Sequence, residues 1–285
     1  MVYTPPDKMT KILKTTAYAV TLLFAVIGIV FTAVFIGMRF GLFNISGSLK
    51  SHQSFIENGA TVPQDGTETT YAWQNTPEWI SLKNAIIKDQ SVIQTVSYQT
   101  GVPARMIASV IVPEQIRYFT SNREIYKQFF EPLQILGVLS QFSLGISGIK
   151  METAIDIEKH LKDQSSPMYL GPDFEHTLDY PEGTSHDAEL YRRLTDTKDR
   201  YYQYLYSALF LKQITAQWQK SGYDIAHNPD VLVTIFNLGF SHSNPNANPQ
   251  VGGAPITIGS QILTFGEIGS QFYNSNELLK EFPRE

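Results

Sequence analysis

A long run without charge opens this chain. No charged residue occurs between Thr15 and Met38, and most of the side chains there are leucine, isoleucine, valine, phenylalanine or alanine. A helix needs about 20 such residues to cross about 30 Å of hydrocarbon. A core helix of a globular protein rarely continues so far without a polar face. We therefore expect residues 15–38 to form one membrane-spanning helix.

The charges that flank this run predict its orientation. Lys8, Lys11 and Lys14 precede it, whereas Arg39 follows it closely. The positive-inside rule then places residues 1–14 in the cytoplasm and everything after Arg39 outside the cell membrane. A cleaved signal peptide is the alternative, but its apolar region usually has about 7–15 residues and ends at a small-residue cleavage site. The longer run here, with no Ala-x-Ala at its end, favours an uncleaved, single-pass signal-anchor.

Composition limits the kinds of domain that the chain can form beyond the anchor. Hydrophobic residues make up 42% of the chain and charged residues 17%, which excludes wholesale disorder. Lys and Arg total 22 against 27 Asp and Glu, so we expect no nucleic-acid partner. The absence of cysteine excludes disulfides, a thiolate nucleophile and a Cys-based zinc site. The histidines show no metal-ligand spacing, and no Gly-rich phosphate loop precedes a Lys-Ser/Thr pair, so neither a metal nor a cofactor is expected.

The remaining chain divides into a tether and a helical domain. Residues 39–76 are rich in Gly, Ser, Asn, Thr and Gln and predict an extracytoplasmic tether, with Trp73 and Trp79 near its end. From residue 77 to residue 285 the spacing of apolar residues is mainly helical. We expect a long surface loop over Gln164–Ser185, a short strand or extended segment over Thr257–Phe265, and no strand pair. Helices are expected over Trp79–Thr100, Ala104–Phe119, Ile125–Phe142, Thr153–Asp163, Ala188–Lys220 and Pro229–Leu238.

Two stretches carry residues suited to chemistry. Glu114 ends the apolar run that follows Pro103. An apolar setting raises the pKa of a carboxyl group, as general acid catalysis of glycoside cleavage requires, although a glutamate at a helix end can simply reach water. The second stretch, Ser143–Ala154, holds several small residues that would let a ligand approach the backbone, although a tight interhelical loop explains them equally well.

A third stretch completes a recognisable pattern. The Gly-Val-Pro helix that ends in Glu114, the Ser-x-Gly element from Ser143 to Thr153-Ala154, and Phe236-Asn237-Leu-Gly occur in the order seen in one family. Together they resemble the lytic transglycosylase and goose-type lysozyme superfamily. The resemblance implies a lysozyme-like helical domain that cleaves the β-1,4 bond between N-acetylmuramic acid and N-acetylglucosamine in peptidoglycan. It also implies that Glu114 is the single acid/base and that the substrate contacts Ser143, Gly145, Ile146, Phe236 and Asn237.

The chain departs from the family pattern at three positions. Gln115 stands where Ser usually follows the Glu, Gly148 replaces a Gln, and Phe236 replaces the Tyr of Tyr-Asn-Ala-Gly. These departures leave open an inactive wall-binding or scaffold protein that retains the fold. An active enzyme would release either a 1,6-anhydro sugar or a hydrolysis product. A water-activating base for hydrolysis would come from the loop residues Asp173, Glu175 and Asp179, for which solvated surface charges remain the simpler interpretation.

Overall fold

The computed structural model describes residues 16–18, 20–22, 24–25, 28–29, 32, 71–120, 146–196 and 198–284. The chain separates into two compact units, Met1–Val62 and Pro63–Glu285. In the first unit the described residues are helical and exposed, with Tyr18, Leu22 and Phe24 among the apolar side chains that face outward. Within the described residues, no helix combines the length and the apolarity that spanning a membrane requires. Much of the expected 15–38 span, and the segments 1–14 and 39–70, lie outside the described residues.

The second unit is mainly helical, which confirms the predicted α class. Its strands, β1 (Pro255–Ile258) and β2 (Gln261–Thr264), form an antiparallel hairpin. Short 3-10 helices occur at η1 (Ala72–Asn75), η4 (Pro172–Phe174) and η5 (Phe240–His242). The α-helices described are α3 (Pro77–Lys88), α4 (Gln90–Thr100), α5 (Ala104–Thr120), α7 (Met151–Lys162), α8 (His186–Thr195), α9 (Tyr201–Lys220), α10 (Pro229–Leu238) and α11 (Phe265–Asn274).

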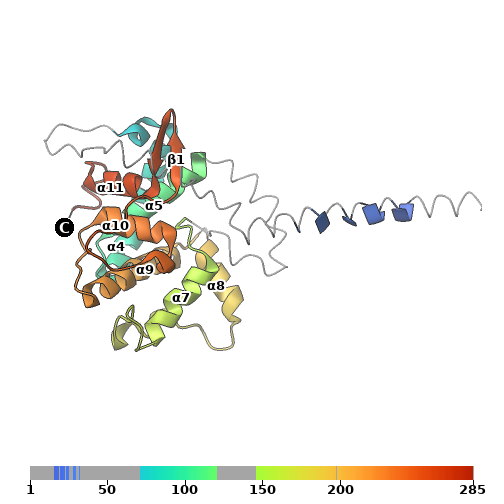
Figure 1. Ribbon diagram of the computed structural model, residues 1–285, viewed down its shortest axis with the longest axis horizontal. Helices are drawn as coiled ribbons and strands as arrows, with labels where there is room; N and C mark the ends of the chain where they lie inside the picture. The colour runs from blue at the N-terminus through green and yellow to red at the C-terminus, as the bar shows by residue number, and fades with distance from the viewer. Residues whose placement is uncertain are drawn as a thin grey trace, which may run out of the picture. The chain divides into compact units, whose positions relative to one another are not determined.

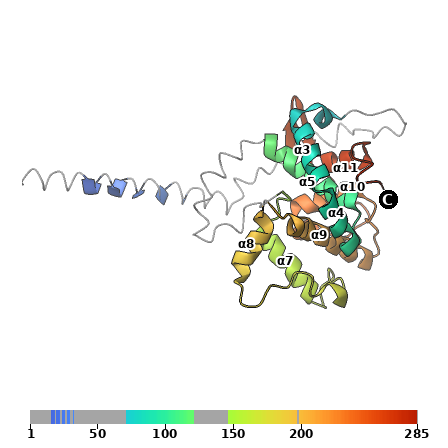
Figure 2. The same cartoon turned by 180° about the vertical axis from the view of Figure 1, so that it is seen from behind.

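Helix α5 runs through the centre of this unit (Figures 1 and 2). Every residue from 105 to 114 is buried, because α3, α4, α9, α10, α11 and β1 all pack against the helix. Pro113 cannot donate a hydrogen bond to the carbonyl of Ser109 four residues earlier. Gly269 of α11 lies against that carbonyl, and a Cβ there would be 2.6 Å from the oxygen. Glycine at this position therefore allows α11 to approach α5 closely beside the site.

Four elements differ from the sequence-based expectation. The single helix expected over Trp79–Thr100 is two helices, α3 and α4, because the chain leaves helical geometry at Asp89, which ends the first and begins the second. Residues 188–220 form two helices instead of one, because the Asp196 side chain accepts hydrogen bonds from the backbone N–H of Lys198 and of Asp199 and turns the chain. The expectation of no strand pair was wrong, since the segment after Pro255 turns at residues 259–260 into the β1–β2 hairpin. Helix α11 was not predicted, although its capping box of Thr264 and Glu267 is visible in the sequence. The expected helix Ile125–Phe142 lies outside the described residues.

The folded unit begins ahead of the expected boundary at Thr76. Trp73 is fully buried, and its ring meets Trp79 edge-on at 4.7 Å between centroids. Its indole N–H also donates to Gln271 of α11 at 3.0 Å. Farther along, Lys83 of α3 forms an ion pair with Glu277 at 2.7 Å. These contacts join the start of the unit to its last helix and to the segment after it.

Arg105, near the start of α5, is buried in the core and binds residues 272–282, which include the end of α11 and the segment after it. Its side chain is fully buried and its guanidinium group lies over the Phe272 ring at 4.9 Å. Burial lowers the pKa of Arg105 to about 10, so the group remains protonated at neutral pH. It donates to five backbone carbonyls at 2.7–2.9 Å, those of Phe272, Tyr273, Ser275, Glu277 and Phe282. One side chain of α5 thus contacts five positions of the segment 272–282.

Candidate active site

Glu114 occupies an enclosed position on the central helix. It is 6% exposed and follows a fully apolar stretch of α5. One turn later, Arg117 forms an ion pair with it, with 2.5 Å between Arg117 Nη2 and Glu114 Oε2. The Arg117 guanidinium in turn lies 5.5 Å from the centre of the Phe265 ring at the start of α11. The carboxyl group is therefore oriented by its own helix and by a cation that α11 supports.

A turn over residues 146–148 packs directly on Glu114. Gly148 has a φ of +65°, a conformation that side chains rarely adopt. A Cβ at Gly148 would lie 2.3 Å from Glu114 Oε1, so a larger residue would force the turn or the glutamate to shift. The neighbouring Ser147 is 1% exposed, and within the described part of the chain its hydroxyl has no hydrogen-bond partner. A buried hydroxyl left in this state is uncommon in folded proteins and marks the turn as a candidate binding element.

The structure thus brings two of the expected elements together. Glu114 and the stretch that was expected to line the sugar cleft meet through Gly148. Ile146, one of the expected substrate-contacting residues, is half-buried in the same turn. Ser143 and Gly145 lie outside the described residues.

The other two expected substrate residues, Phe236 and Asn237, lie on α10. The Phe236 ring packs edge-on against Phe210, with 5.3 Å between centroids. The Asn237 side-chain oxygen accepts a hydrogen bond from the backbone N–H of Ala254 at 2.8 Å, and Gly253 lies against the same oxygen. None of the contacts described joins Asn237 to Glu114. Asn237 therefore holds the segment that leads into the β1–β2 hairpin, while α10 as a whole packs against α5.

Two of the three candidate bases in the loop 164–185, Glu175 and Asp179, are occupied by local interactions, whereas Asp173 is exposed in η4. Glu175 accepts hydrogen bonds from Tyr169 and Gln164, which lower its pKa. Asp179 pairs with Lys162 at 2.7 Å and with His176 at 2.6 Å, and these partners lower its pKa too.

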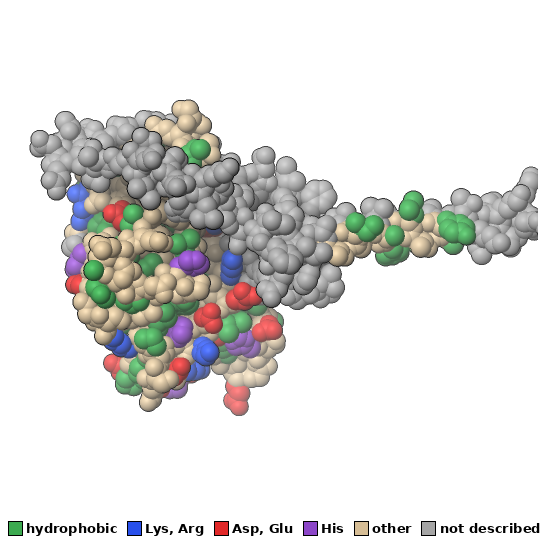
Figure 3. Space-filling model, viewed as in Figure 1, with side chains coloured by type: hydrophobic (Ala, Val, Ile, Leu, Met, Phe, Trp, Pro, Cys, Tyr) green, Lys and Arg blue, Asp and Glu red, His purple; other side chains and the backbone are tan. Residues whose placement is uncertain are grey.

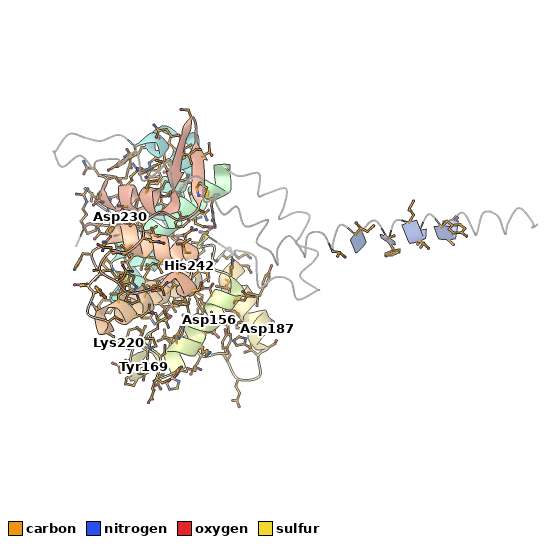
Figure 4. The ribbon with its side chains drawn as sticks, in the orientation of Figure 1. Asp156, Tyr169, Asp187, Lys220, Asp230 and His242 are labelled. Carbon is orange, nitrogen blue, oxygen red and sulfur yellow. The ribbon has the colours of Figure 1, made fainter. Side chains whose placement is uncertain are left out.

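The loop is also attached to α9, because Lys220 donates a hydrogen bond to the Tyr169 carbonyl, and the two residues lie side by side in Figure 4. Charged and histidine side chains also gather over the α7–α8 side in Figure 3. These contacts attach the loop to the domain.

Sequence reasoning missed a second enclosed carboxylate, Glu158 of α7. Tyr180 and Tyr206 both donate to its Oε1, and His186 lies 2.8 Å from its Oε2. Hydrogen bonds to Glu158 and Asp187 raise the pKa of His186. No local motif could reveal this cluster, because the partners are 22, 28 and 48 residues away along the chain. In the described residues, no group of acidic and histidine side chains is arranged to hold a metal ion.

Replacement of Gly148 by Ala tests the contact between the turn and Glu114. Non-glycine residues with positive φ cost about 1–2 kcal/mol, and overpacking adds about 1–3 kcal/mol. Gly183 is the matched control, because its φ is +79° and an added Cβ meets nothing within 4 Å. We expect Gly148→Ala to lower the urea midpoint of unfolding more than Gly183→Ala does. Equal urea midpoints for the two variants would show that Gly148 does not contact Glu114 closely in solution.

Comparison with known proteins adds no relative. No family model matches the chain, and neither a curated protein nor a solved structure matches it.

Proposed function

We propose that this protein is a membrane-anchored enzyme that cleaves peptidoglycan outside the cytoplasmic membrane, with a lysozyme-like helical domain and Glu114 as general acid and base. One observation carries the proposal: Glu114, buried on the central helix, lies directly beneath a glycine turn. The order of the sequence motifs resembles that of lytic transglycosylases and goose-type lysozymes, in which a glutamate and a small-residue stretch flank the sugar. The Ser147 hydroxyl in the turn, which has no hydrogen-bond partner among the described residues, supplies a polar group for a sugar.

The proposed reaction uses one carboxyl group in two steps. The protonated Glu114 gives its proton to the glycosidic oxygen as the bond from that oxygen to C1 of N-acetylmuramic acid breaks. The resulting carboxylate then takes the proton of the sugar's own 6-hydroxyl, whose oxygen bonds to C1. The products are a 1,6-anhydro sugar and a free 4-hydroxyl, and no water is consumed. Attack by water in the second step gives hydrolysis instead. Arg117 stabilises the carboxylate form between the two steps.

A second candidate function is a wall-binding or scaffold protein without activity. The departures from the family pattern at Gln115, Gly148 and Phe236 favour it, because each changes a position that the resemblance places at the site. Muropeptide analysis separates the two candidates. The full-length protein in detergent is incubated with purified sacculi, and the soluble products are identified by mass spectrometry. Anhydro-ended or reducing-ended muropeptides above the buffer blank support an enzyme and identify its reaction, whereas binding without release identifies a scaffold.

The anchor has its own test. The charge-free run 15–38 and the exposed apolar side chains of its described residues support membrane insertion. We expect full-length protein to stay in the pellet after carbonate extraction of membranes, because about 20 apolar residues insert almost irreversibly. Recovery of full-length protein in the supernatant, or a mature N-terminus beyond Met38, would contradict an uncleaved anchor.

A further inference from the structure

Two glutamine side chains hold both backbone hydrogen-bonding groups of Ile146. The Ile146 N–H donates to Gln203 Oε1 at 2.8 Å. The Ile146 carbonyl accepts from Gln115 Nε2 at 2.6 Å. Ile146 thereby lies between α5, which carries Gln115, and α9, which carries Gln203.

Each glutamine is fixed at its other end. Gln203 is 2% exposed, and its amide nitrogen donates to the Asp196 carbonyl in the connection between α8 and α9 at 2.6 Å. Its amide group is therefore held from two sides and cannot rotate away from Ile146 without breaking a part-buried hydrogen bond. Gln115 directly follows Glu114 on α5, so the position of its backbone is tied to that of the candidate acid.

The held residue leads straight into the contact with Glu114. Gly148 lies two positions after Ile146 and packs against the Glu114 carboxyl group, where an added Cβ would lie 2.3 Å from Oε1 and force one of the two residues to shift. A displacement of Ile146 would therefore also displace Gly148 and change its contact with the Glu114 carboxyl group. Gln115 and Gln203 define where this turn lies relative to Glu114.

We propose that Gln115 and Gln203 are positioning residues that hold the Ile146–Gly148 turn at a fixed distance from Glu114 and so set the space in which a sugar meets the acid. This inference rests on the proposed function. It also gives the departure at Gln115, where the resembling family has Ser, a role of its own: the longer side chain spans the distance to the turn. The two residues act through the turn and need no contact with the glycan.

The test uses the full-length protein in detergent with soluble glycan oligomers as substrate. Gln203→Leu removes the acceptor for Ile146, and Gln115→Leu removes the donor. Gln203→Glu retains an acceptor oxygen for the Ile146 N–H. Gln213→Leu is the matched control, since Gln213 is also buried on α9 and donates to a backbone carbonyl, that of Ile157 in α7. For each variant, kcat, KM, the folded fraction and the hydrogen exchange of the Ile146 amide are measured.

A displaced reacting group can cost about 100-fold in rate, so we expect Gln203→Leu to lower kcat per folded molecule by about 10- to 100-fold and to raise KM much less. Exchange of the Ile146 amide should accelerate by a similar factor. Gln115→Leu should lower kcat in the same direction. Gln203→Glu should recover part of the loss, because it keeps the acceptor for Ile146 but removes the donor to the Asp196 carbonyl. Gln213→Leu should leave both kcat and exchange near the wild-type values.

Three outcomes would overturn the inference. Wild-type exchange of Ile146 in Gln203→Leu would show that the glutamine does not hold the turn. Faster exchange with an unchanged kcat would show that the turn does not position the reaction. An equal loss of kcat in Gln213→Leu would show a general effect of weakening α9. If Gln203→Leu does not fold, Gln115→Leu and Gln203→Glu decide between the same results. A wild-type protein that cleaves nothing refutes the proposed function, and the exchange data then report separately whether the glutamines hold the turn.

Discussion

Replacing Glu114 with Gln is expected to lower the rate of glycan cleavage by about 10²–10⁴-fold, the usual contribution of general acid–base catalysis. Glutamine has nearly the same shape and its amide oxygen can still accept from Arg117, but it carries no acidic proton for the leaving oxygen. Binding to sacculi should survive, because the turn over residues 146–148 is unchanged. Rates are measured as muropeptides released per folded molecule, with the folded fraction taken from circular dichroism of the same sample.

Glu182→Gln is the matched control for this experiment. Glu182 is exposed and lies outside the stretches that the proposal places at the site, so the same loss of charge occurs away from the buried position. Its cleavage rate should remain within about twofold of the wild type, since an exposed side chain outside the site contributes little. Cleavage by Glu114→Gln at the rate of Glu182→Gln would show that Glu114 is not the acid.

Replacing Arg105 with Met is expected to lower the free energy of unfolding by about 3–5 kcal/mol. Five carbonyls lose a donor together, and for Glu277 and Phe282 it is the only donor described. Each buried unpaired group costs about 1–3 kcal/mol before water and local rearrangement compensate. The total free energy of unfolding of a native domain is only about 5–15 kcal/mol, so the expected loss is a large fraction of it. Arg105→Lys should recover only part of the loss, because an ammonium group lacks the planar fork that serves several acceptors at once.

The control for Arg105 is Arg192→Met. Arg192 is half-exposed and pairs with Glu189 and Asp196 on the surface, where ion pairs contribute about 0–1 kcal/mol. Urea unfolding followed by tryptophan fluorescence compares the two variants. Nearly equal midpoints for Arg105→Met and Arg192→Met would refute the structural role given to Arg105.

The sequence predicted those features of the fold that are local. The helix over Pro229–Leu238 has its predicted bounds, and α5 differs from its prediction by a single residue, because apolar spacing and the adjoining Pro or Gly act within a few residues. The break at Asp196 is also local, but its signal is an aspartate side chain that competes for backbone N–H groups inside a helical pattern. The capping box before α11 was overlooked although it was readable.

The long-range contacts of the site could not be predicted from the sequence. Apolar spacing indicated that Glu114 would lie in an apolar helix, and the small residues indicated a close approach near Gly148. Nothing in the sequence paired Ile146 with Gln203, since 57 residues separate them. The role of Arg105 was hidden for the same reason, because its acceptors lie 167–177 residues further along the chain. A single arginine in an apolar helix gives no indication of five carbonyls that converge from elsewhere.

The placement of those acceptors has a consequence for the order of events during synthesis. A chain that emerges from its N-terminal end presents α5 long before residues 272–282 exist to accept from Arg105. Until then, the helix that carries Glu114 holds a charged group that cannot be buried without a large penalty. We therefore expect α5 to reach its final environment only after Phe282 has been released. The candidate site is therefore completed only after α11 and the segment that follows it have been synthesised.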